Sequence, residues 1–381
     1  MNHLDILIPF GLPPAELTRD IMRELRLPAL ANLVARVKTG SRQGYILDEF
    51  ARALPHEAWL TQSFGLENHI HILEIHPESQ HSSPPVALAV MRAFGLTVNE
   101  GHWFILHPAH IHIARDHLVL TDIRQVTLSE ANSRALFDEA KPFFEEDNRI
   151  LLYGDANTWF VRANDWQQLQ TSTPDAACGH NIDIWMPYGE GARAWCKLQN
   201  KVQMQWFENT LNQQRAATSM QAINALWLWG GGSPGINLVS APVNYSYSHA
   251  FNLYGWARIF GQLTAHKISI NGNAEKLIAT PGAHGFLLLD DLIAPALTGE
   301  WSEWIQQLQA IERDWFAPLL HALQSGKLKQ LKLIFTGNTQ ITELTTTPLS
   351  LKKFWIKPSL VKLIRETMKS TLAEERKEPT K

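Results

Sequence analysis

Residues 186–232 constrain the fold more than any other part of the chain. They open with a turn in which two glycines, both able to adopt positive φ, flank Glu190, a residue that suits the start of a helix. Residues 192–215 then contain neither Gly nor Pro, which predicts roughly six or seven helical turns. The apolar run at residues 225–229, followed by three glycines, predicts a core strand that ends in a loop.

The predicted helix carries two apolar rows. One is formed by Trp195, Leu198, Val202 and Trp206, and the other by Met204, Phe207 and Leu211. A helix that is apolar over so much of its circumference is mostly buried. We therefore expect Trp195 and Val202 to be buried, together with Trp227 and Trp229 of the predicted strand. The unit is either a core helix packed on a core strand or a binding site where the strand meets its glycines.

Composition places the chain among globular proteins. Its 381 residues are 45% hydrophobic and 19% charged, enough to bury a core in one large or two smaller domains. A net charge of −3 argues against nucleic-acid binding. The two cysteines, Cys178 and Cys196, form no disulfide framework. No basic leader and no apolar run of about 18 residues is present, so we expect a cytoplasmic protein without a transmembrane segment.

The chain begins like a doubly wound α/β protein. A short apolar strand at residues 4–9 is followed by a loop containing Gly11 and by helical patterning at residues 15–36. Further strands are predicted at residues 286–289 and 329–335, around a long helix. We expect one α/β domain over residues 1–351, with a central, mostly parallel sheet flanked by helices. Segments with an antiparallel pattern within residues 69–162 form an insertion or a sheet edge.

The C-terminal residues 352–381 differ in charge. Residues 352–369 contain six basic side chains and one acid, Glu366, on an apolar stripe of helical spacing. We predict a basic C-terminal helix that packs on the domain and ends in a frayed tail. The alternative is a basic amphipathic helix lying on an anionic surface.

Histidines and one pair of aspartates are the candidate metal ligands. The histidines cluster in two groups, His69, His71, His76 and His81, and His102, His107, His110, His112 and His117. His110 and His112 are two residues apart, so on a strand both face the same side and can ligate zinc or another transition metal. The alternative is a polar strand face. Asp290 and Asp291 follow a predicted strand, where they can bind a divalent cation or, alternatively, cap the next helix.

A ligand site is predicted where the 225–229 strand ends. It comprises Asn200, Gln203, Arg193, Asp155, Gly230, Gly231 and Gly232. Ligands bind beyond the carboxyl ends of α/β strands, and glycines expose backbone N–H groups to them. Asn200 and Gln203 offer paired donors and acceptors, and Arg193 can pair with a phosphate. The alternative is that both amides only tie the helix to a neighbouring loop.

These residues resemble a known family, the bacterial RpfE-type regulatory proteins, which are similar to cofactor-independent phosphoglycerate mutase of the alkaline-phosphatase superfamily. The resemblance reaches residue 335 and rests most specifically on Met186-Pro187 with Gly189, Arg193 and Trp195, on Asn200 with Gln203-Met204, on Asn224 through Gly232, on Leu289-Asp290-Asp291-Leu292 and on residues 315–320. It implies an alkaline-phosphatase-like fold.

The mutases resemble one another in two metal-binding motifs that this chain lacks. An Asp-Gly follows their first strand, where this chain reads Pro9-Phe10-Gly11. The look-alike of their Gly-Asp-His-Gly turn, at residues 282–285, has Ala283 in the Asp position. Phosphoryl transfer depends on metals to neutralise charge. We therefore expect a regulatory or binding protein on a degenerate phosphotransferase scaffold, without a metal cofactor, that takes a small anionic ligand or a protein partner.

The alternative to that expectation is an active metal-dependent phosphatase or phosphoglycerate mutase. It would hold Mn or Zn on ligands drawn from His107, His110, His112, Asp290 and Asp291.

Overall fold

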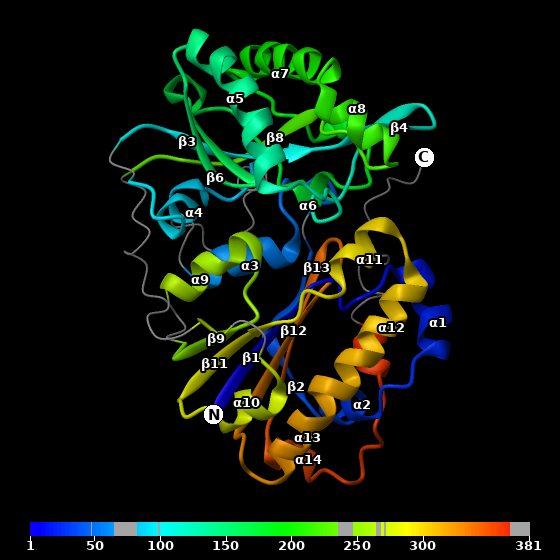
Figure 1. Cartoon of the computed structure of the whole chain (residues 1–381). Coiled ribbons are helices and arrows are strands. Elements are labelled where there is room, and N and C mark those ends of the chain that lie inside the picture. Colours follow the sequence, from blue (N-terminus) through cyan, green and yellow to red (C-terminus); the bar gives the residue numbers. More distant parts are fainter. Residues whose placement is uncertain are drawn as a thin grey trace, which may run out of the picture. The chain divides into compact units, whose positions relative to one another are not determined.

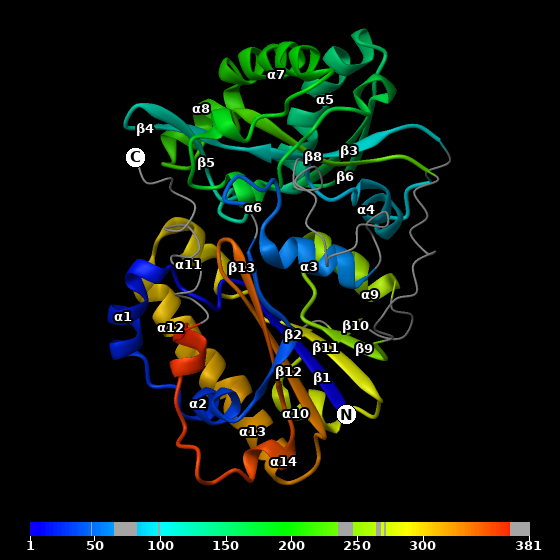
Figure 2. The same cartoon turned by 180° about the vertical axis from the view of Figure 1, so that it is seen from behind.

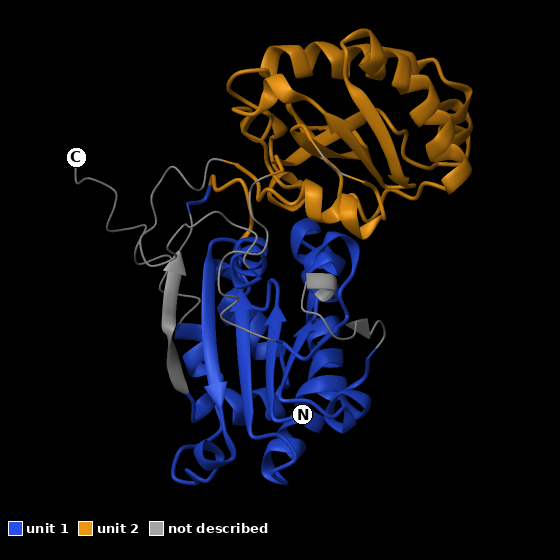
Figure 3. Ribbon diagram, turned by 90° about the vertical axis from the view of Figure 1, so that its left-hand side faces the viewer, with its two compact units in different colours: residues 1–49, 55–64, 243–381 blue, residues 50–54, 65–242 orange. Residues whose placement is uncertain are grey.

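A computed structural model describes residues 1–46, 48–64, 82–97, 100–234, 247–263, 268–269 and 272–365. The chain divides into two compact units, coloured separately in Figure 3: unit 1 comprises residues 1–49, 55–64 and 243–381, and unit 2 comprises residues 50–54 and 65–242. The prediction was one domain with an insertion or sheet edge inside residues 69–162. The inserted part is instead larger and has its own sheet and core. The histidines from 69 to 81 lie outside the described residues.

The sheet of unit 1 is built around strand β1 (His3–Ile8), which pairs in parallel with β11 (His284–Leu288) and β12 (Gln330–Thr336). Its other strands are β9 (His249–Phe251), β10 (Ile268–Ser269), β13 (Gln340–Thr346) and β2 (Lys38–Ile46). Among the described residues the order is β10-β9-β11-β1-β12-β13-β2. The first five strands are parallel to one another, and β13 is antiparallel to both of its neighbours, β12 and β2. The predicted mostly parallel sheet is confirmed.

Helices cover both faces of this sheet. They are α1 (Ala15–Glu24), α2 (Pro28–Ala35), α3 (Pro55–Ser63), α9 (Arg258–Leu263), α10 (Ala274–Ala279), α11 (Ile293–Thr298), α12 (Trp301–Ile311), α13 (Ala317–Gln324) and α14 (Pro348–Leu351), with a π-helical turn at Glu312–Phe316. In Figures 1 and 2, α3 and α9 lie on one face, and α2, α12 and α13 on the other. Glu312 accepts hydrogen bonds from the backbone N–H groups of Ala29 and Leu30 at the start of α2. These groups have no acceptor within the helix and need one from outside it.

Unit 2 contains an antiparallel sheet with the strand order β6-β7-β3-β8. The strands are β3 (Trp103–Ala109), β6 (Ile150–Asp155), β7 (Thr158–Arg162) and β8 (Ala225–Gly232), and a separate hairpin joins β4 (Ile111–Ala114) to β5 (His117–Leu120). The strand predicted at residues 225–229 is therefore real, but it continues through the glycines and lies at the edge of an antiparallel sheet. The ligand-site prediction had assumed that this strand belongs to the parallel sheet, and that assumption was wrong.

The helices of unit 2 pack on both faces of that sheet. They are α4 (Ala87–Ala93), α5 (Glu130–Glu146), α6 (Pro174–Ala177), α7 (Ala192–Phe207) and α8 (Thr210–Ala217). α5 and α7 lie side by side over one face, and α4 lies on the other (Figures 1 and 2). Trp195 and Val202 of α7 are buried in one cluster with Trp159 of β7. Trp227 and Trp229 are also buried, so the four predicted burials are confirmed.

The long helix predicted at residues 192–215 is broken into α7 and α8. Asn209 starts α8, because its side chain accepts a hydrogen bond from the backbone N–H of Leu211. Met204 and Phe207 are 75% and 84% exposed, so burial of the second apolar row was a wrong prediction. One side of α7 faces the sheet, and the side that carries Met204 and Phe207 is exposed among the described residues.

The C-terminal segment follows α14 along unit 1. Within it, residues 361–365 are helical, and the predicted frayed tail lies outside the described residues. No helix in the described part of the chain is both long and apolar enough to cross a membrane.

Candidate functional site

The carboxyl edge of the parallel sheet in unit 1 is where α/β proteins bind ligands. Phe10 lies there, just after β1, with a positive φ of 52°. Its backbone N–H donates to Thr336 Oγ1 (3.3 Å), and its carbonyl accepts a hydrogen bond from Trp304 Nε1 (2.9 Å). A non-glycine residue in this conformation costs on the order of 1–3 kcal/mol and persists only when its surroundings hold it. The end of β1 is thus rigidly held around a buried phenyl ring.

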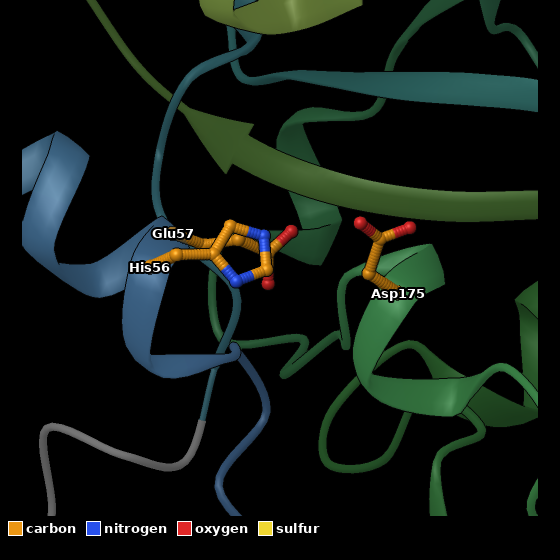
Figure 4. Close-up of side chains that lie close together, drawn as sticks. All are labelled: His56, Glu57 and Asp175. Carbon is orange, nitrogen blue, oxygen red and sulfur yellow. The ribbon is translucent and has the colours of Figure 1, made fainter. Parts of the chain in front are cut away.

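Helix α3 places two titratable side chains beside Phe10. The ring of His56 lies 5.9 Å from the ring of Phe10, between centroids. His56 and its neighbour Glu57 belong to the first turn of α3 (Figure 4), and both are buried. Buried imidazole and carboxylate groups at a strand terminus are typical of metal or proton-transfer sites. Neither residue was among the candidate ligands of the sequence analysis.

One turn further along, Trp59 anchors α3 to the sheet. Its ring stacks on Phe286 of β11 (centroids 5.9 Å apart, planes 17° apart), and its Nε1–H donates to Glu343 Oε1 (2.9 Å). Glu343 in turn pairs with Lys332 Nζ at 2.8 Å. These contacts set the position of His56 and Glu57 relative to β1.

Asp290 and Asp291 reach the same edge from β11. The N–H of Leu289 donates to the carbonyl of Leu7, which ties the end of β11 to β1. Asp290 is partly exposed and Asp291 is exposed. The alternative that they cap the next helix is wrong, because α11 starts from Leu292 without a side-chain cap. Of the two predicted metal ligands in unit 1, Asp290 is therefore partly buried, whereas Asp291 is exposed.

The turn at residues 282–285 lies at the opposite, amino edge of the sheet. His284 starts β11 and is aligned with His3 of β1. Its Nε2 lies 3.1 Å from Asp5 Oδ1, and the Tyr247 hydroxyl donates to the other oxygen of Asp5 (2.9 Å). His284 and Asp5 thus contact each other on neighbouring strands, before the carboxyl end of β1 where Phe10 lies. The turn therefore does not supply a counterpart of the mutase Gly-Asp-His-Gly motif at the carboxyl edge.

The residues of the predicted ligand site all belong to unit 2. Asn200, Gln203 and Arg193 are all exposed on α7. A Cβ on Gly231 would lie 2.4 Å from Phe104 Cε1 and 2.9 Å from His102 Nε2. The N–H of Gly230 donates to Ser83 Oγ. Two of the glycines thus make room for neighbouring side chains, a packing role.

Asp155 and the fallback histidines are likewise held by local contacts in unit 2. The Asp155 side chain accepts from the N–H of Asn157 in the β6–β7 turn. His107 is buried and bonds the carbonyl of Asn157, and burial lowers its pKa. His110 and His112 face the same side, as predicted, with stacked rings 5.7 Å apart. Neither belongs to a group of three metal-ligating side chains in the described part of unit 2.

A further charged cluster in unit 2 surrounds α6. The guanidinium of Arg124 pairs with the buried carboxylates of Asp122 and Asp175, the latter at 3.0 Å. Asp175, drawn in Figure 4, lies in α6, whose first turn is capped by Thr173. Burial, and then the charges of Asp122 and Asp175, raise the pKa of the Cys178 thiol to about 12. In this cluster one guanidinium pairs with two carboxylates.

The fold is that of a mixed α/β protein with a parallel-rich sheet and helices on both faces, interrupted by a second unit. No protein-family model matches the chain, and no curated protein does either. Among solved structures it is similar to the PH0037 protein from Pyrococcus horikoshii, with a TM-score of 0.53 and 11% identity, over 97% of this chain and 92% of that one. That likeness shows a shared fold over nearly the whole chain.

A second solved structure is the cofactor-independent phosphoglycerate mutase from Thermoplasma acidophilum. It matches with a TM-score of 0.38 and 11% identity, over 91% of this chain and 90% of that one. The resemblance to RpfE-type proteins stays a prediction.

Proposed function

We propose that this chain is a regulatory or ligand-binding protein on a degenerate phosphotransferase scaffold, with its ligand site at the carboxyl edge of the unit 1 sheet. The observation that carries the proposal is Phe10. The resemblance to the mutases implies a metal-binding aspartate directly after the first strand. Here a buried phenyl ring fills that place, and Thr336 and Trp304 occupy the backbone groups of Phe10.

The charges of the side chains at this edge limit the chemical class of ligand that can bind there. Glu57, Asp290 and Asp291 are carboxylates, and Arg193, the cation predicted to hold an anion, lies in unit 2. A phosphorylated ligand at the edge therefore needs a counter-cation that it brings with it, because like charges repel. A ligand of this kind binds as its magnesium or manganese complex.

The second candidate function is a metal-dependent phosphatase or mutase. One observation favours it: His56 and Glu57 are buried beside the end of β1, and such side chains are ligands for Mn or Zn. The two functions differ in turnover. A degenerate scaffold binds phosphorylated compounds without converting them, whereas the enzyme needs a metal and produces product.

The test combines ligand binding with turnover on the full chain. Thermal unfolding is followed with phosphate, phosphoglycerates and nucleotides, with and without Mn²⁺, and hydrolysis of p-nitrophenyl phosphate and interconversion of phosphoglycerates are measured in parallel. We expect a ligand-dependent rise in Tm without turnover, lost in Asp290→Asn. Asp20→Asn, an exposed aspartate of α1, is the matched control. Manganese-dependent turnover abolished by Glu57→Gln would overturn the proposal in favour of the enzyme.

A further inference from the structure

The segment after α14 is fixed to unit 1 by backbone and side-chain hydrogen bonds. The Nε of Arg36 donates to the carbonyl of Ile356 (2.9 Å), and the N–H of Ser359 donates to the carbonyl of Ala31 in α2 (3.4 Å). Lys362 Nζ donates to the carbonyl of Val37 (2.6 Å), and Leu363 is buried. Residues 352–365 therefore have a defined path along α2 and the residues that follow it.

This docked segment turns its largest apolar side chains outward. Phe354 is 84% exposed and Trp355 is 68% exposed, and their rings meet edge to face with centroids 5.3 Å apart. Leu349, in α14, is 75% exposed, and Val361 is 48% exposed. Because the backbone around them is anchored, their exposure is not the fraying of a chain end. An exposed cluster of this kind marks an interaction surface.

The same segment is uniformly basic. Residues 347–365 contain Lys352, Lys353, Lys357, Lys362 and Arg365 and no acid. Residues 25–46, which supply α2 and the backbone partners, also contain no acid, and Glu343, the acid that precedes the segment, is buried and paired. Burial and then the charge of Lys353 lower the pKa of Lys362, so like charges already crowd each other.

We propose that the surface formed by Leu349, Phe354, Trp355 and the surrounding lysines is a peripheral binding site for an anionic lipid bilayer. Aromatic rings partition into the headgroup region, and lysines beside them are attracted to acidic lipids, so the two kinds of side chain act together there. A nucleic-acid duplex would engage the lysines through its phosphates but would leave the exposed aliphatic chains of Leu349 and Val361 without a role, since only unpaired bases stack on aromatic rings. The site is separate from the proposed ligand site at Phe10.

The experiment is vesicle co-sedimentation of the full chain. Vesicles of phosphatidylcholine alone are compared with vesicles containing about 30% phosphatidylserine, at low and high salt. Two variants remove one component each: Phe354→Ser with Trp355→Ser, and Lys352→Glu with Lys357→Glu. The matched controls are Met204→Ser with Phe207→Ser, which are equally exposed on α7, and Lys327→Glu with Lys329→Glu, which are exposed elsewhere on unit 1.

We expect binding to the acidic vesicles only, weakened by salt. The lysine variant should lower the partition coefficient by at least roughly 25-fold, about fivefold for each lost lysine charge, and the added carboxylates lower it further. The aromatic variant should lower it as well, while both controls bind like the parent and all variants keep the parental Tm. Equal binding to neutral vesicles, equal loss in the controls, or binding to a DNA duplex but not to vesicles would each overturn the proposal.

Discussion

Phe10 is a non-glycine residue that is held in a positive-φ conformation at the end of β1. A φ of 52° is uncommon for an aromatic residue, and here the backbone on both sides is hydrogen-bonded into place. That no aspartate directly follows the first strand is already visible in the letters Pro9-Phe10-Gly11. The strain and its two hydrogen bonds could not be anticipated, because Thr336 and Trp304 are roughly 300 positions away and meet Phe10 only in the folded sheet.

The two cysteines should differ sharply in reactivity. Cys178 is buried, and its raised pKa of about 12 keeps the thiol neutral, whereas Cys196 on α7 is partly exposed. Because the thiolate is the reactive form, we expect one thiol per native chain to react with a chromogenic disulfide reagent at pH 8, and two in denaturant. Reaction of Cys178 in the native protein, identified by mass spectrometry, would contradict the buried cluster around α6.

At the scale of elements, the strand β8 illustrates what a pattern can and cannot predict. The apolar run was enough to predict a buried strand, and the burial of Trp227 and Trp229 followed. The glycines after it were interpreted as a loop open to a ligand. A glycine leaves room for a ligand and for a neighbouring side chain alike, so the sequence does not tell the two apart. Only the positions of Phe104 and His102 distinguish the two cases, and those depend on pairing with β3. Periodicity likewise did not reveal that Met204 faces solvent.

Two neighbouring glycines of β8 give a direct test of this packing. In Gly231→Ala the new methyl group would overlap the ring of Phe104, so we expect a loss of about 1–3 kcal/mol in the free energy of unfolding. In Gly232→Ala the nearest atom, of Pro85, is 3.4 Å away, so the cost should be much smaller. Urea unfolding measures both. Equal stability of the two variants would show that Gly231 is not closely packed.

Trp227 tests the strand as a whole. Its side chain is 3% exposed, and its Nε1–H donates to the carbonyl of Ser172 (2.9 Å). Trp227→Ala should therefore cost about 3–5 kcal/mol in unit 2. The exposed Trp355→Ala provides the comparison, with little expected change in the unfolding midpoint. If Trp227→Ala unfolds at the parental urea concentration, the buried position of β8 is incorrect.

At the scale of the whole molecule, the division into two units was the hardest feature to predict. The chain enters unit 2 at residue 50, returns to unit 1 for α3 and leaves again at residue 65. No change in composition marks these crossings. His56 and Glu57 were missed for this reason: their place beside β1 depends on the short return, whereas β1, β11 and β12 are apolar runs that alone indicate a parallel sheet.

Acid should destabilise unit 2. Burial lowers the pKa of His102 to about 4, and it also lowers the pKa of His107, His110 and His180. The unfolded chain therefore binds more protons, so this stability is complete above the unfolded value of about 6.5 and is lost as pH falls toward 4. We expect the urea midpoint to fall between pH 7 and 4.5, less steeply in His102→Gln. A slope unchanged by that substitution would contradict the account.

The central proposal, that this chain holds no two-metal centre at the end of β1, is tested most directly by elemental analysis. The full chain is purified without chelators, and its manganese, zinc and iron are measured per chain by mass spectrometry. With Phe10 in place of the aspartate after β1, the account predicts far less than one equivalent of any of these metals. Two equivalents of manganese or zinc, lowered by His56→Gln or Glu57→Gln, would contradict it and identify α3 as part of an active metal centre.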